Sequence, residues 1–118
     1  MKRITPSVPD YDLNDLPCSI VAVSCALGYV PDFTEYMKKL KSDGYATLNA
    51  SNRFIRDNLD VKKRTDYKRG QRPLLKDLHL DGRAIVCVYG HFVYLDHETY
   101  WSFFENEDDD VVAVWELE

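Results

Sequence analysis

The 118-residue chain has no apolar run near the roughly 18 residues that a membrane-spanning helix needs, and no apolar stretch follows Met1 as a signal peptide requires. Its three cysteines are an odd count without a disulfide spacing pattern, and its five glycines form no phosphate-binding loop. These absences predict a protein of the reducing cytosol, with no membrane partner.

Lysine and arginine are also absent from residues 84–118, which hold nine acidic residues. All 15 basic residues lie in residues 1–83 beside 11 acidic ones, so the first part carries +4, the second −9 and the whole chain −5. A negative total disfavours nucleic-acid binding through overall charge, although it leaves room for a local basic patch.

Such a patch is indicated by residues 53–76, where nine basic residues face three acidic ones for a local charge of +6. With Tyr67 interleaved, this stretch could contact phosphates. The alternative, which we favour, is a solvated surface that pairs with the acidic segment 105–110. The binding candidates within the stretch are Lys62, Lys63, Arg64, Lys68 and Arg69.

The chain does contain enough apolar residues for a folded core. Its composition is 45% hydrophobic and 13% aromatic, which excludes a disordered chain. A domain of this length buries roughly two-thirds of its unfolded surface, so it needs no disulfide or metal to fold. Residues 1–14, with two prolines, predict an extended N-terminal arm, and residues 15–118 predict a single domain.

The order of the patterns predicts helices first and an antiparallel sheet afterwards, which is an α+β domain. The segment 19–27 is apolar on nearly every face and is stopped by Gly28, as expected of a buried central helix. The run 84–89 is continuously apolar, as expected of a strand buried on both faces. The other expected elements are a helix opened by Pro31-Asp32 and stopped by Gly44, a helix over 49–59, one helical turn at 74–78, and strands over 61–67, 92–95, 98–104 and 111–117.

Cys18 is the first candidate for chemistry. Asp15 is a good N-cap and Pro17 suits a first helical turn, which places Cys18 at the start of the buried helix. Free N–H groups and the helix dipole stabilise a thiolate there, and the same N–H groups can hold an oxyanion. The alternative is a buried structural thiol, the role that Cys25 and Cys87 fit because each lies inside an apolar run.

His91 is the second candidate, and it lies between Gly90 and Phe92 in an apolar stretch. A lone histidine in a strand is commonly structural, but a glycine neighbour leaves room for a ligand or another backbone. No pair has metal-ligand spacing, because Cys18 and Cys25 are roughly 10 Å apart along a helix and Cys87 and His91 roughly 13 Å apart along a strand. We therefore expect neither a metal nor a cofactor.

Two motifs together resemble the papain-like cysteine peptidase fold. Cys18-Ser19-Ile20-Val21-Ala22-Val23-Ser24-Cys25-Ala26-Leu27-Gly28 resembles the nucleophile helix, and Gly90-His91-Phe92-Val93-Tyr94-Leu95 resembles the histidine strand. The similarity is to short papain-fold proteins of phage and bacterial genomes related to the double-glycine leader peptidases, and it spans about residues 14–117. It implies Cys18 as nucleophile, His91 as base, and the cytoplasm of a host cell as location if the chain is phage-encoded.

The family places an Asp or Asn beside the histidine, and here the corresponding residue is Ser102. If Asp96-His97 is a two-residue turn, the register puts Ser102 opposite His91. Asp96 and Glu105 have the wrong parity to share that face, and Asn106 has the right parity but lies two pairs further along. Ser102 accepts a hydrogen bond but carries no charge, so the resemblance implies a Cys–His dyad with a weak orienting residue.

The resemblance also implies an amide or acid a few residues before the cysteine that completes an oxyanion hole, and Asn14 is the candidate because Asp15 is expected to cap the helix. Three hypotheses for function remain open. The first is a cysteine hydrolase that cleaves an amide or peptide bond in a protein or peptide substrate. The second is a catalytically weak or inactive papain-fold protein that binds a host or partner protein, and the third is a nucleic-acid-binding module that uses residues 53–76.

Overall fold

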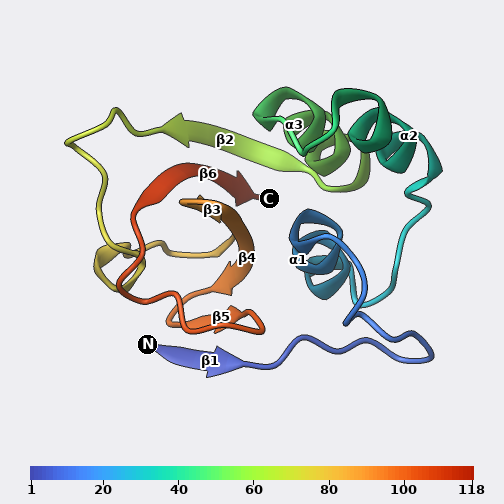
Figure 1. Cartoon of the computed structure of the whole chain (residues 1–118). Coiled ribbons are helices and arrows are strands. Elements are labelled where there is room, and N and C mark those ends of the chain that lie inside the picture. The colour runs from blue at the N-terminus through green and yellow to red at the C-terminus, as the bar shows by residue number, and fades with distance from the viewer.

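Helices occupy the first half of the chain and most of the sheet comes from the second half, as the computed structural model of residues 1–118 shows (Figure 1). The protein is an α+β domain with three α-helices and a six-stranded sheet, so the predicted fold class is confirmed at this level. The elements are β1 (Lys2–Ile4), α1 (Cys18–Leu27), α2 (Thr34–Asp43), α3 (Leu48–Asn58), β2 (Val61–Asp66), the 3₁₀ turn η1 (Leu75–Asp77), β3 (Arg83–Val88), β4 (His91–Asp96), β5 (Thr99–Trp101) and β6 (Val111–Leu117).

The sheet is mixed, whereas the sequence predicted an antiparallel one. Its strand order is β1-β5-β4-β3-β6-β2, and every neighbouring pair is antiparallel except β1 and β5. The parallel pair arises because Lys2–Ile4, within the N-terminal arm, lies along β5 as an edge strand. Three residues without an apolar pattern carry no strand signal of their own, so this pairing depends on tertiary contact alone.

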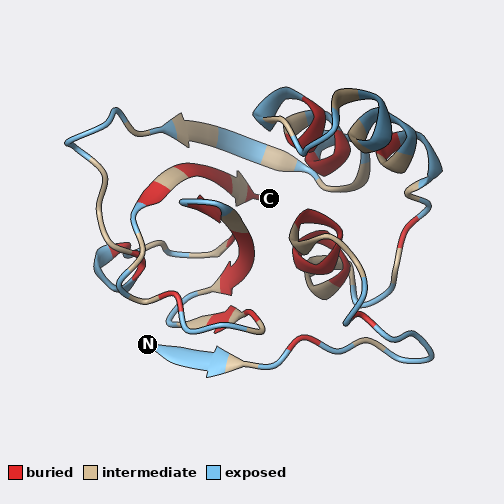
Figure 2. Ribbon diagram, in the orientation of Figure 1, coloured by how far each residue is buried: buried red, intermediate tan, exposed pale blue.

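Both faces of the central strands are buried, as the apolar run 84–89 predicted (Figure 2). Along β3, Ile85 and Cys87 pack in a core shared with the helices, whereas Val86 and Val88 pack in a second core with Leu75 of η1. Figure 1 shows the sheet curving around this second core, with α1 on the outer side beside β4. The site described below lies where α1 meets β4 and β5.

Helix α1 is apolar on nearly every face, which matches its position between the sheet and the other two helices. It ends at Gly28, whose φ of 83° places it in the left-handed region that favours glycine. Its N-cap is Pro17, not the predicted Asp15, and no side chain caps the helix. Pro17 has an extended backbone (ψ 144°), so the helix begins at Cys18, two residues later than a cap at Asp15 implies. No helix in the chain combines the length and apolar character needed to cross a membrane.

A chain of buried hydroxyl groups joins the three helices. The Tyr36 hydroxyl of α2 lies 2.6 Å from Ser19 Oγ of α1 and 3.0 Å from Ser51 Oγ of α3. The Tyr36 ring stacks on Phe54, with ring centroids 4.5 Å apart. Because Ser19 directly follows Cys18, this network also anchors the first turn of α1.

Candidate active site

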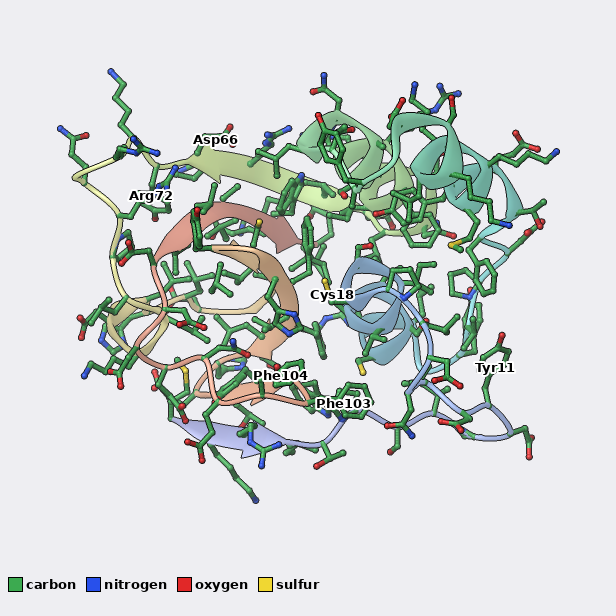
Figure 3. All side chains as sticks on the ribbon, in the orientation of Figure 1. Tyr11, Cys18, Asp66, Arg72, Phe103 and Phe104 are labelled. Atoms are coloured by element: carbon green, nitrogen blue, oxygen red, sulfur yellow. The ribbon has the colours of Figure 1, made fainter.

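Cys18 is the first residue of α1, on the side of the helix that faces the sheet (Figure 3). The first-turn N–H groups of α1 lack an intrahelical acceptor, and no side-chain cap replaces one. The backbone N–H groups of Phe92, Ser19 and Cys18 itself favour the charged form of the thiol. A half-buried sulfur at a helix start, where the first-turn N–H groups are unpaired, is in an arrangement that favours anionic charge.

Burial nevertheless raises the pKa of the Cys18 thiol, and the three N–H groups only offset part of that effect. The same cause raises the pKa of Cys25 and of Cys87 to about 11, and for Cys87 the neighbouring Cys18 thiol adds to it. Cys18 is therefore protonated at neutral pH, so a nearby base must remove its proton before the sulfur can act as a nucleophile.

His91 begins β4, directly after Gly90, whose φ of 75° turns the chain back from β3. Its ring is half-buried, and burial lowers its pKa, an effect that the charge of Asp109 partly opposes. His91 is thus neutral at neutral pH, which is the form that accepts a proton. The rings of His91 and Phe104 pack edge to face, with their centroids 5.5 Å apart and their planes at 83°.

One cavity of about 350 Å³ brings the four predicted site residues together. It lies over the start of α1 and the start of β4, and Figure 3 shows Cys18 above the segment that carries Phe103 and Phe104. Most of its remaining lining is apolar or aromatic. The lining residues are Asn14, Leu16, Cys18, Val21, His91, Phe92, Trp101, Ser102, Phe103 and Phe104.

The β4–β5 register differs by two residues from the predicted one. Asp96 pairs with Thr99, so the turn is His97–Glu98, not Asp96-His97. His97 was predicted to be the second residue of the turn but is the first, with a φ of 55° that residues other than glycine rarely adopt. A shift of two residues preserves which side chains share a face, so Ser102 stays on the side of His91.

Ser102 forms three hydrogen bonds with its hydroxyl group. Its Oγ lies 3.0 Å from His91 Nε2, accepts from the Phe104 N–H at 3.1 Å, and donates to Asn106 Oδ1 at 2.6 Å. Asn106 Nδ2 in turn donates to Asp109 Oδ2 at 2.7 Å. The sequence analysis gave Asn106 the right parity but set it aside as too far along, and it missed Asp109, because it did not foresee that β5 ends at Trp101 and the chain then folds back.

Asn14 lines the cavity, but its amide is partly committed elsewhere. Asn14 Nδ2 donates to Asp12 Oδ1 at 2.7 Å, and the Asn14 backbone N–H donates to the same oxygen at 3.0 Å. These two bonds lower the pKa of the Asp12 carboxyl, the backbone bond having the larger effect. The second hydrogen on Asn14 Nδ2 makes no hydrogen bond within the protein, so it is available to a ligand.

The basic stretch lies away from this cavity, on β2 at the edge of the sheet and on the loop that follows. Lys62, Lys63, Lys68 and Arg69 are exposed, and none is within ion-pairing distance of a carboxylate. Lys76 pairs with Asp108 of the acidic segment at 2.8 Å, so the predicted pairing of the two charged regions is confirmed for this residue alone. Arg64 pairs with Asp66 on its own strand and lies over the Trp115 ring.

A larger hollow of about 920 Å³ lies between α2 and α3 and contains none of the predicted site residues. Acidic and basic side chains mix along its walls. No three His, Cys, Asp or Glu side chains in the protein converge to hold a metal ion. No protein-family model matches the chain, and neither a curated protein nor a solved structure is significantly similar to it.

Proposed function

We propose that the protein is a papain-like cysteine hydrolase that cleaves an amide or peptide bond. The observation that carries the proposal is the shared cavity, in which a cysteine at a helix start and a histidine with an oriented ring face the same space. The order of nucleophile helix and histidine strand along the chain supports the papain-like assignment, with Cys18 on α1 and His91 on β4.

Catalysis begins from a neutral pair, because burial raises the pKa of Cys18 and lowers that of His91. The neutral imidazole removes the thiol proton as the sulfur attacks the carbonyl carbon, which forms a C–S bond and a tetrahedral oxyanion. The imidazolium then donates the proton to the leaving amine as the C–N bond breaks. Water, deprotonated by His91, hydrolyses the resulting thioester and restores the thiol.

The oxyanion is held by the donors that line the cavity at the start of α1. The backbone N–H of Cys18 is one donor, because the first turn of the helix offers unpaired N–H groups. The second amide hydrogen of Asn14 is the other, with Asp12 holding the amide through the first. Asn14 and Cys18 line the same cavity as His91.

The cavity walls favour a substrate with a bulky apolar group next to the scissile bond. Leu16, Val21, Trp101, Phe103 and Phe104 surround Cys18 and His91, whereas no Asp, Glu, Lys or Arg side chain lines the cavity. Burying one large apolar side chain is worth about 1.5–3 kcal/mol, enough to select it over glycine by roughly tenfold or more.

Acylation of Cys18 tests the proposal. The protein is mixed with the p-nitrophenyl esters of N-acetylphenylalanine and of N-acetylglycine, and the acylated residue is identified by mass spectrometry. We expect a transient acyl group on Cys18, formed faster from the phenylalanine ester, and none at this position in a Cys18→Ala variant. Acylation that is spread equally over Cys25, Cys87 and surface lysines would contradict the proposal.

A second candidate is a papain-fold protein that binds a partner and has weak or no activity. The observation that favours it is the direction of the two pKa shifts, since a raised thiol pKa and a lowered imidazole pKa both oppose a preformed ion pair. Under this alternative, the Cys18→Ala variant retains the biological effect of the protein, whereas a hydrolase loses it.

Nucleic-acid binding is a third candidate, and the exposed basic residues without acidic partners favour it. The variant in which Lys62, Lys63, Lys68 and Arg69 are replaced by Gln tests it. A module of this kind loses affinity steeply as salt rises, and the salt slope decreases as these contacts are removed. Absence of binding to single-stranded or duplex DNA and RNA at low salt would exclude this function.

A further inference from the structure

A line of three hydrogen bonds leads from the proposed base to a carboxylate. His91 Nε2 to Ser102 Oγ is 3.0 Å, Ser102 Oγ to Asn106 Oδ1 is 2.6 Å, and Asn106 Nδ2 to Asp109 Oδ2 is 2.7 Å. The two middle residues are buried, with Ser102 2% and Asn106 5% exposed. Buried polar side chains in a continuous chain are ordered by one another, because each unmade bond leaves a desolvated group without a partner.

The carboxylate determines the direction of every bond in this line. An ionised Asp109 can only accept, so the amide nitrogen of Asn106 must face it and the amide oxygen must face Ser102. The Ser102 hydroxyl then donates its single hydrogen to that oxygen. Towards His91 it can only accept, so His91 carries its ring hydrogen on Nε2.

We propose that Asp109 is a positioning residue that fixes the tautomer of His91 through Asn106 and Ser102, so that the unprotonated Nδ1 faces the cavity as the base. Asp109 thereby takes the place of the acid that a cysteine–histidine pair ordinarily has in direct contact with the imidazole. The inference rests on the proposed function, because only proton transfer from Cys18 requires one particular ring nitrogen to be free.

The charge of Asp109 also acts on the protonated ring. When His91 accepts a proton, all donors in the line still point toward the carboxylate, so the line stabilises the imidazolium without rearrangement. The other titratable or charged groups near the ring are the Cys18 thiol of α1 and the Arg3 guanidinium of β1, which donates to the Ser102 carbonyl oxygen at 3.2 Å. Asp109 is the charge that raises the pKa of His91 against the larger, opposite effect of burial.

The tautomer of His91 is measured by two-bond ¹H–¹⁵N correlation spectroscopy on the full-length ¹⁵N-labelled chain between pH 5 and 9. In the wild type, we expect the Nε2–H form to predominate by roughly tenfold, as one well-formed hydrogen bond allows. Asp109→Asn removes the charge with little change of shape. Because an amide at position 109 can donate as well as accept, the Asn106 amide can then flip. This variant should reduce the tautomer preference several-fold and lower the pKa of His91.

Asp110→Asn is the matched control, because it removes the same charge one residue away and its side chain forms no hydrogen bond or ion pair. It should leave the tautomer ratio unchanged. Backbone amide spectra show whether each variant is folded. If Asp109→Asn does not fold, the tautomer of His91 in the wild type is the test, because a predominant Nδ1–H form there overturns the proposal.

Two further outcomes overturn it: an unchanged tautomer ratio in folded Asp109→Asn, or an equal response in Asp110→Asn. The measurement needs no turnover, so its failure is distinct from failure of the proposed function. If Cys18 reacts in a His91-dependent manner but the tautomer ratio is the same in Asp109→Asn, only the proposal about Asp109 is wrong. If the tautomer ratio changes in Asp109→Asn but Cys18 is inert, the line of hydrogen bonds is a structural network and the hydrolase proposal is wrong.

Discussion

Replacing Tyr36 by Phe removes one oxygen atom from the junction of the three helices. That oxygen lies 2.6 Å from Ser19 Oγ and 3.0 Å from Ser51 Oγ, and both serines are almost fully buried. Two hydrogen bonds are lost at a net value of about 1 kcal/mol each, so the free energy of unfolding should fall by about 2 kcal/mol. The ring itself remains stacked on Phe54, so no apolar burial is lost.

For a domain of this length, about 2 kcal/mol corresponds to a fall of about 8 °C in the melting temperature. Urea unfolding followed by circular dichroism measures the free energy directly. Tyr45→Phe is the control, because Tyr45 is 69% exposed and makes no hydrogen bond, and it should change stability by less than about 0.5 kcal/mol.

A double variant separates hydrogen bonding from packing. Tyr36→Phe leaves the hydroxyls of Ser19 and Ser51 without their Tyr36 partner, and Ser51→Ala removes one of these two hydroxyls, so the double variant should be no less stable than Tyr36→Phe alone. The reasoning is refuted if Tyr36→Phe is as stable as the wild type, or if the losses of the two single variants simply add.

Three further predictions concern the site and its support. Because burial lowers the pKa of His91, the unfolded chain binds a proton below about pH 6.5 more readily than the folded chain, so the wild type loses stability as the pH decreases through this range. In thermal melts at pH 7.5 and pH 5, the melting temperature of His91→Gln should therefore decrease less than that of the wild type. Phe104→Ala should leave stability within about 0.5 kcal/mol, because the side chain is 64% exposed, but it should weaken the preference for the phenylalanine ester. Asn52→Ala should cost about 1–2 kcal/mol by urea unfolding, because Asn52 Oδ1 accepts from the buried Trp115 Nε1 at 2.8 Å.

The sequence predicts the elements well where periodicity and burial agree. The all-apolar segment before Gly28 and the run from Ala84 are buried as expected, because such patterns leave no polar face for solvent. The N-terminal strand Lys2–Ile4 could not be predicted, since its position depends on pairing with a strand about a hundred residues away in the chain.

The site was predictable in its members but not in its connections. Parity places Ser102 on the side of His91 whichever two-residue turn is assumed, so the contact survives an error of two residues in the register. The path from Ser102 to Asp109 depends on how the chain folds after Trp101, and loop geometry of this kind has no periodic signal. The raised pKa of Cys18 was equally hidden, because it arises from tertiary burial that outweighs the helix-start N–H groups.

The most direct test of the Cys18–His91 pair is the rate of iodoacetamide alkylation of each cysteine at pH 7.5, followed by peptide mass spectrometry in the wild type and in His91→Ala. We predict that Cys18 reacts fastest, because Cys25 and Cys87 have pKa values raised to about 11, whereas the proposed base His91 lines the same cavity as Cys18. In His91→Ala, the alkylation rate of Cys18 should decrease by about tenfold or more, while the rates of Cys25 and Cys87 should be unchanged. Equal, slow labelling of all three thiols, or a Cys18 rate that is the same in His91→Ala, would contradict the account.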